Sequence, residues 1–230
     1  MPGAPIHLQP CTDLAPRVLL PGDPHRALAM AQALLIEPAM FNHQRGLWGY
    51  TGEAPDGAPL TIQATGMGGP SAAIVVEELI GLGAQALIRV GTCGALDPSL
   101  ALGVPLAVAG VIPADGTSRA LGAGERVLPD PGLTARLAVN AVSSVIVTSD
   151  LFYDDRPDVQ AEWVAAGARA VEMEAATVLQ ICSLRGVAGA CLLGVTDLLA
   201  GGEGRTRIEP GHLDELGVEL GRLAMAALSE

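Results

Sequence analysis

The chain contains no lysine, so all 13 of its basic residues are arginines. This absence excludes a Walker P-loop, a Schiff-base lysine and a lysine general base, because each of these sites requires the ε-amino group. Any phosphate site must therefore be built from arginine side chains and backbone N–H groups. Aromatic residues are also scarce, at 3% of the 230 residues, so each ring near a candidate site is informative.

Positive charge is in short supply as well. The net charge is −12 and the isoelectric point is about 4.6, which leaves no basic surface for a nucleic acid or an anionic membrane. The four cysteines form no C-x-x-C pair, and no apolar run reaches 18 residues, so we expect reduced thiols, no metal site and no membrane span. No signal-peptide pattern is apparent, and we expect a cytoplasmic protein.

Short apolar runs alternate with amphipathic helical segments along the whole sequence. The patterns predict strands at 17–20, 48–53, 60–65, 86–90, 104–111, 142–147, 170–173 and 188–195. They predict helices at 25–35, 133–141, 174–185 and 212–228, and a further helix that the segment 66–71 opens and that runs to about residue 82. This alternation is typical of an α/β fold. We predict a single domain over residues 1–230, because no linker, internal repeat or charge block divides them.

A cation interrupts one of the predicted buried strands. Residues 86–90 read as a short β-branched strand that contains Arg89 and ends at Gly91, and a small-residue turn, Gly91 to Gly94, follows. A guanidinium inside a sheet costs several kcal/mol unless an anion meets it. Either a protein carboxylate or a bound anion held by the N–H groups of this turn could supply that charge, and the two interpretations have equal weight on this stretch alone.

Other charged residues also lie at predicted element ends. Arg26 falls in the first turn of a helix, where the dipole is unfavourable for a cation, so it pairs either with Asp23 or with a bound anion. Glu172 and Glu174 alternate around Met173, which places both carboxylates on one face of an extended segment. Such a pair suits binding of hydroxyl groups or of arginine.

Asp197 is the last of these residues, and it follows the buried run at 188–195. An acid at a strand exit is a candidate general acid or base, and an equally good helix cap.

Seven short motifs in order give a resemblance to a known family. They are PGDPHR (21–26), RG (45–46), GMGGPS (66–71), RVGTCG (89–94), SDLFY (149–153), VEMEAA (171–176) and TD (196–197). Their order and spacing resemble those of the bacterial and archaeal hexameric purine nucleoside phosphorylases. The resemblance implies the phosphorylase/hydrolase-like fold, a single α/β domain with a central mixed, partly barrel-like β-sheet flanked by helices, assembled as a trimer of dimers.

The resemblance also implies a reaction and a set of site residues. Inorganic phosphate would attack C1′ of a purine nucleoside as co-substrate, with no cofactor, and would release the base and pentose 1-phosphate. The positions that match the phosphate site are Gly22, Arg26, Arg89 and Thr92, with Arg45 contributed by the neighbouring subunit. The positions that match the nucleoside site are Met67, Phe152, Glu172, Met173 and Glu174, with His7 reaching the neighbour's ribose.

Asp197 matches the acid at purine N7. The family places an arginine after this acid; Arg205 is carried over as that residue, although Arg207 is an equal candidate because the loop aligns only with a gap. The segment 133–148 is also shorter than the family pattern.

Several alternatives stay open at this level. A uridine phosphorylase would require an amide and an arginine for the pyrimidine edge, and no such pair is evident. Methylthioadenosine remains a possible substrate because the 5′ pocket cannot be deduced from the sequence. A hydrolytic nucleosidase would not need Arg26, Arg45 and Arg89 together. A nucleoside-binding protein without turnover is the alternative from a different class, whereas a dinucleotide-binding dehydrogenase lacks its G-x-G-x-x-G fingerprint.

Overall fold

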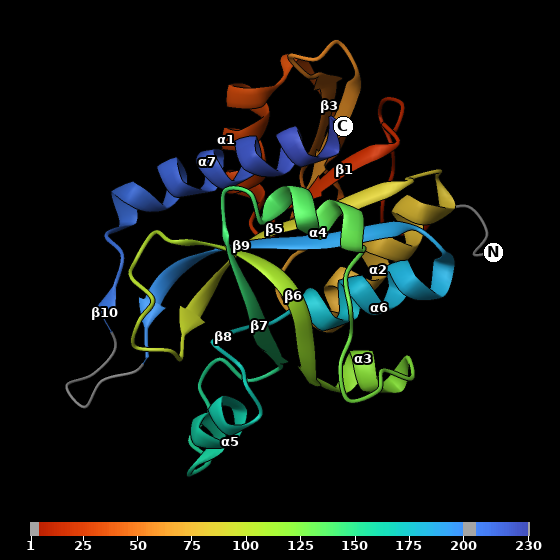
Figure 1. Cartoon of the computed structure of the whole chain (residues 1–230). Helices are drawn as coiled ribbons and strands as arrows, with labels where there is room; N and C mark the ends of the chain where they lie inside the picture. The colour runs from red at the N-terminus through yellow and green to blue at the C-terminus, as the bar shows by residue number, and fades with distance from the viewer. Residues whose placement is uncertain (1–4, 200–205, 230) are drawn as a thin grey trace.

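A ten-stranded mixed sheet organises the computed structural model, which describes residues 5–199 and 206–229 (Figure 1). The strand order is β10-β9-β6-β7-β8-β5-β1-β4-β3-β2, and β9 also pairs with β5. This additional pairing closes β5, β9, β6, β7 and β8 into a five-stranded barrel that continues into an open sheet. The expected mixed, partly barrel-like sheet is therefore confirmed.

The strands have the following bounds: β1 Arg17–Leu20, β2 Ile36–Asn42, β3 Gly49–Glu53, β4 Pro59–Gln63, β5 Ala86–Ala95, β6 Pro105–Ala114, β7 Val142–Ser149, β8 Ala170–Glu172, β9 Ala188–Leu198 and β10 Thr206–Arg207. The helices are α1 Pro24–Leu34, α2 Gly69–Gly81, α3 Gly116–Ala120, α4 Pro131–Leu137, α5 Val159–Ala165, α6 Ala175–Arg185 and α7 Pro210–Leu228, with a 3-10 turn at Gln44–Gly46.

Helices cover both faces of the sheet, as Figure 1 shows, with α1, α4 and α7 on one face and α2 and α6 on the other. Alternate residues of β1 face the two layers: Leu19 packs in the cluster with α1 and α7, while Val18 and Leu20 pack with α2 and α6. A strand buried on both faces reads as a continuous apolar run, which is why the sequence identified it. None of the helices in the described ranges is long and apolar enough to cross a membrane.

Strand β5 is longer than the sequence predicted. The expected end at Gly91, with a turn at Gly91–Gly94, is wrong, because β5 continues to Ala95 and pairs with β9 along its whole length. The local glycine signal was overridden by this long-range pairing. The backbone of this segment therefore forms strand ladders and does not provide the anion-binding turn that we expected.

An irregularity in this ladder sets the position of Asp197. Cys93 lies opposite Val195, but Gly94 lies opposite Asp197, so Thr196 is an extra residue in β9. A bulge of this kind redirects the side chains that follow it. Asp197 thus belongs to β9 itself, and it does not cap a following helix.

Candidate functional site

Arg89 is buried between two glutamates. Its Nε donates to Glu172 Oε2 at 2.8 Å, and its Nη2 contacts the Glu174 carboxylate. The exposed fractions of the three side chains are 4%, 1% and 6%. Burial lowers the pKa of Arg89, but the fields of Glu174 and Glu172 outweigh it and the pKa lies above its ordinary value. An internal ion pair, one of the two interpretations of the sequence, is present in the structure.

One observation also supports the other interpretation, in which Arg89 binds an anion. Nη1 of Arg89 is buried and has no hydrogen-bond partner within the part of the chain that the structure describes. An unpaired buried donor of a charged group is costly, and native proteins rarely leave one without a function. Arg89 therefore has two of its three nitrogens held by protein and one available to a bound anion.

Glu172 is held from several sides. Its carboxylate accepts from the backbone N–H groups of Glu174 and Ala175, at 2.9 to 3.0 Å, and from Thr148 Oγ1. These backbone groups open helix α6, where an anion is favoured by the unpaired N–H groups and by the helix dipole. The prediction that Glu172 and Glu174 face the same way is confirmed, since both reach Arg89.

Glu174 links two loops at the site. Its Oε1 accepts from the backbone N–H of Gly68 at 2.6 Å. Gly68 has φ of 88°, a conformation that glycine adopts without strain, and it lies just before α2. Burial raises the pKa of Glu174, against the opposing field of Arg89. The carboxylate is thereby fixed beside the guanidinium and the β4–α2 loop.

Arg26 lies close enough to this cluster to sense its charges. Burial lowers the pKa of Arg26, Asp23 raises it, and Arg89 and Glu174 act on it in opposite directions. The carboxylate of Asp23 caps α1, where Oδ1 accepts from the N–H groups of His25 and Arg26 at 2.7 and 3.0 Å. Arg26 is half-buried. Two arginines near one another favour a bound anion between them.

Gly22 and Thr92 occupy different positions relative to this cluster. The carbonyl of Gly22 accepts from the N–H of Gly66 at 3.0 Å, so the β1–α1 and β4–α2 loops lie side by side. Thr92 is half-buried on β5, three residues beyond Arg89. In a regular strand this spacing points two side chains to opposite faces, and a role for Thr92 beside the same anion stays a prediction.

Asp197 is 4% exposed. Thr196 Oγ1 lies 2.9 Å from its Oδ2, and Arg207 Nε lies 3.6 Å from its Oδ1. Arg207 reaches it because β10 pairs antiparallel with β9 and places Arg207 opposite Asp197. Arg205, the other candidate partner, lies outside the described residues. Only this strand pairing identifies Arg207 as the neighbour of Asp197, and no local sequence pattern reveals it.

Apolar side chains predicted to contact the nucleoside lie nearer the surface. Met67 is 86% exposed and Phe152 46%, while Met173 is half-buried. Phe152 stacks edge-on against Tyr153, with ring centroids 5.0 Å apart and an interplanar angle of 81°. Exposed apolar groups of this kind are suited to cover a planar base or a sugar.

His7 and Arg45 make contacts of a different kind. His7 Nδ1 lies 2.8 Å from Oε1 of Glu78, which also accepts from the backbone N–H of His7. Arg45 is exposed and has φ of 58° in the 3-10 turn. A left-handed conformation at a non-glycine residue is often associated with function.

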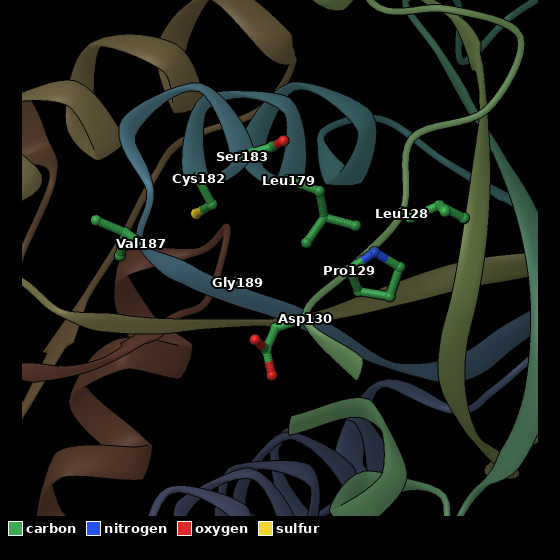
Figure 2. A pocket seen from close by; sticks show the side chains of 8 residues that line it. All are labelled: Leu128, Pro129, Asp130, Leu179, Cys182, Ser183, Val187 and Gly189. Carbon is green, nitrogen blue, oxygen red and sulfur yellow. The ribbon is translucent and has the colours of Figure 1, made fainter. Parts of the chain in front are cut away.

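The structure has a cavity of about 190 Å³ that is not this site (Figure 2). It lies between α6, the start of β9 and the segment before α4, and it is lined by Leu128, Pro129, Asp130, Leu179, Cys182, Ser183, Val187 and Gly189. None of the predicted site residues is among them. Burial raises the pKa of the Cys182 thiol to about 12, so it stays protonated. Across the described ranges, no group of three or more His, Cys, Asp or Glu side chains could hold a metal ion.

Comparison with known proteins gives consistent matches over most of the chain. The model of the phosphorylase superfamily matches residues 16–228. A purine nucleoside phosphorylase DeoD-type from Caldanaerobacter subterraneus subsp. tengcongensis is 36% identical over 201 residues, covering 83% of this chain and 86% of that protein.

Proteins with the same name from two other organisms are similarly related. The one from Geobacillus kaustophilus is 34% identical over 209 residues, or 86% of this chain and 87% of the relative. The one from Jannaschia sp. is 38% identical over 199 residues, with 81% and 84% covered.

Proposed function

The chain belongs to the phosphorylase superfamily, and we propose that it cleaves the N-glycosidic bond of purine nucleosides with inorganic phosphate. The products are the free base and pentose 1-phosphate. Three relatives that match most of the chain are named purine nucleoside phosphorylases. Phosphate is the co-substrate, and the proposed chemistry needs no cofactor.

The observation that carries this proposal is the unpaired Nη1 of Arg89. A phosphate oxygen that accepts from this buried donor, with Arg26 nearby, forms charge-assisted hydrogen bonds worth about 1.5–3 kcal/mol each. The net charge of −12 repels anions at long range, so binding has to come from such short-range contacts.

Glu174 is proposed to hold the ribose beside this phosphate. One of its oxygens contacts Arg89 and the other accepts from Gly68 N–H, and a carboxylate retains further lone pairs for the 2′- and 3′-hydroxyls. Phosphate and ribose would then be fixed against the same guanidinium. Such positioning of the nucleophile and C1′ lowers the activation free energy, because the translational and rotational entropy of the reactants is already lost on binding.

Asp197 is proposed as the acid that protonates the leaving purine at N7. A purine leaves poorly as an anion, and the transition state of such a displacement resembles an oxocarbenium ion, as in glycoside hydrolysis. Arg207 supports this residue in the structure, at 3.6 Å. Of the two arginines that the sequence offered, Arg205 and Arg207, we therefore propose Arg207 as a partner of the acid.

We also propose that the site is completed by a second copy of the chain in a hexamer. His7 and Arg45 would then serve the neighbour's ribose and phosphate. The contact of His7 Nδ1 with Glu78 leaves Nε2 as the nitrogen that can face a substrate, and the exposed Arg45 is free to extend from its turn.

Gly91→Ala tests whether phosphate binding depends on the position of the Arg89 guanidinium. A methyl group at Gly91 would lie 2.7 Å from Nη2 of Arg89 and 3.1 Å from Cδ2 of Leu193. We expect kcat/KM for phosphate to fall by about 10- to 100-fold, because a displacement near 1 Å of a positioning group has effects of this size. Steady-state kinetics with phosphate as the varied substrate measure it.

Gly124→Ala is the matched control for this substitution, because a Cβ there has no neighbour within 4 Å. It should keep the wild-type constants. Unchanged phosphate kinetics in Gly91→Ala would contradict the proposed position of the phosphate.

The function is tested by assaying base release from inosine, adenosine, guanosine, methylthioadenosine and uridine, each with and without phosphate. The proposal expects release from purine nucleosides only when phosphate is present, with one pentose 1-phosphate formed per base. Release that does not depend on phosphate identifies a hydrolase, and binding without product identifies a nucleoside-binding protein. Faster turnover of uridine than of any purine nucleoside would contradict the substrate class.

A further inference from the structure

We propose that Thr148 and Glu172 are a positioning pair that holds Arg89 toward phosphate, and that Glu172 does not contact the nucleoside. This inference rests on the proposed function and gives Glu172 a different role from the one that the sequence resemblance implied. Thr148 lies on β7, Glu172 at the end of β8, and Arg89 on β5, so the three residues tie together three strands of the closed barrel.

The acceptor capacity of Glu172 is the first line of support. A carboxylate has about four lone-pair positions. Those of Glu172 receive the Thr148 hydroxyl, Arg89 Nε and the backbone N–H groups of Glu174 and Ala175. Its side chain is 1% exposed. A base or a ribose would have to displace one of these four donors to reach it.

Thr148 has a fixed hydrogen-bond direction. Its Oγ1 accepts from the backbone N–H of Ala176 at 2.9 Å, and this group can only donate. The hydroxyl proton is therefore directed to the acceptor-only carboxylate of Glu172. Thr148 is fully buried, with 0% exposed. The hydroxyl thus joins the first turn of α6 to the carboxylate that holds Arg89.

Because the guanidinium of Arg89 is rigid, the contacts that hold it also fix the direction in which it can bind phosphate. A guanidinium is planar and its five N–H groups point in fixed directions. Glu172 holds the Nε edge and Glu174 holds Nη2, so the plane of the group and the direction of Nη1 are both set. Nη1 is the nitrogen that has no protein partner in the described ranges. Loss of the Thr148 hydroxyl should therefore affect phosphate more than nucleoside.

The experiment compares Thr148→Val, which removes the hydroxyl at constant shape, with Thr148→Ser, which keeps it. We expect Thr148→Val to raise the KM for phosphate by about tenfold, the effect of losing one hydrogen bond to a charged group. The KM for inosine should stay within about twofold of wild type by the same argument, because Glu172 makes no nucleoside contact. Thr148→Ser should restore the KM for phosphate.

Thr61→Val is the matched control. Thr61 is also a fully buried threonine whose hydroxyl accepts one backbone N–H, from Ala15 at 2.9 Å, and bonds one side-chain oxygen, of Thr51 at 2.7 Å. Thr61→Val should lower the Tm about as much as Thr148→Val does, without changing the KM for phosphate. Equal kinetic effects of Thr61→Val and Thr148→Val would mean that Thr148 only supports the fold, and would overturn the proposal.

Glu172→Gln gives the same test if Thr148→Val does not fold. A larger rise in the KM for inosine than in that for phosphate would show that Glu172 contacts the nucleoside, and would also overturn the proposal.

Calorimetric titration with inorganic phosphate separates this inference from the proposed function. Wild-type protein without phosphate-dependent turnover refutes the function, whereas phosphate binding that is weakened in Thr148→Val still supports the pair. Wild-type protein that binds no phosphate refutes both.

Discussion

Asp197→Asn is expected to lower kcat for phosphorolysis of inosine by about 10²–10⁴-fold, the usual contribution of a general acid. An asparagine amide keeps the shape and can donate a hydrogen bond to N7, but it cannot transfer a proton to the departing base. The side chain is buried at the end of β9 and lies 3.6 Å from Arg207. Steady-state kinetics at saturating phosphate measure this loss.

A substrate with an activated base is the internal control for this variant. The base of 7-methylguanosine already carries a positive charge and leaves without protonation, so Asp197→Asn should cleave it at a rate within about tenfold of wild type. Asp97→Asn is the control for a general effect of removing a carboxylate, because the carboxylate of Asp97 pairs with Arg169 and accepts from the backbone N–H of Ser99, neither of which is a proposed site residue. Equal losses on inosine and 7-methylguanosine would mean that Asp197 does not act as the acid.

Arg89→Met is expected to reduce kcat/KM for phosphate by about 10²–10³-fold, the size of effect seen when a donor to a developing negative charge is removed. Stability should change at the same time. Glu172 and Glu174 would remain buried without their cation, which costs about 3–5 kcal/mol of the free energy of unfolding at neutral pH. Phosphate kinetics and urea unfolding measure the two effects separately.

The stability loss of Arg89→Met should depend on pH in a defined direction. Burial already raises the pKa of Glu174, and the adjacent Glu172 acts in the same direction. Without Arg89, the folded protein binds a proton at Glu174 more tightly than the unfolded chain does. The free energy of unfolding should therefore rise as the pH falls from 7 toward the unfolded glutamate pKa of about 4.3.

A double variant, Arg89→Met with Glu174→Gln, separates binding from folding. It removes the repulsion between the two carboxylates, so part of the stability at pH 7 should return, while the binding of inorganic phosphate, measured by calorimetric titration, stays lost. If Arg89→Met keeps the wild-type KM for phosphate, Arg89 has only the structural role, and the proposed phosphate site is wrong.

Several features of the fold could be predicted because their signals are local. The strand at 17–20 was predicted with the bounds that the structure has, since a strand buried on both faces is a continuous apolar run. The convergence of Glu172 and Glu174 was predicted from the two-residue period of an extended chain, and their shared contact with Arg89 confirms it. The extended segment itself is shorter than predicted, because β8 ends at Glu172 and Glu174 is the N-cap residue of α6.

Other elements could not be predicted from local patterns. Strand β2 is exposed at five of its seven residues and lacks an alternating pattern, so only its pairing with β3 makes it a strand. Helices α3 and α5 have five and seven residues, too few to show a clear helical period. The true end of β5 depended on β9, a strand about a hundred residues later in the sequence.

The sequence by itself determined the α/β class, the family resemblance and the chemistry of the charged groups: arginines without lysine, two alternating glutamates and a buried acid after an apolar run. The tertiary structure alone decided which anions Arg89 meets. Its contact with Glu172 joins residues 83 positions apart, and only the pairing of β5 with β8 in the sheet brings them together. An arginine within an apolar run indicates that a counter-charge is required. The identity of that counter-charge is fixed by packing, because the free-energy cost of burying a cation depends on every group around it.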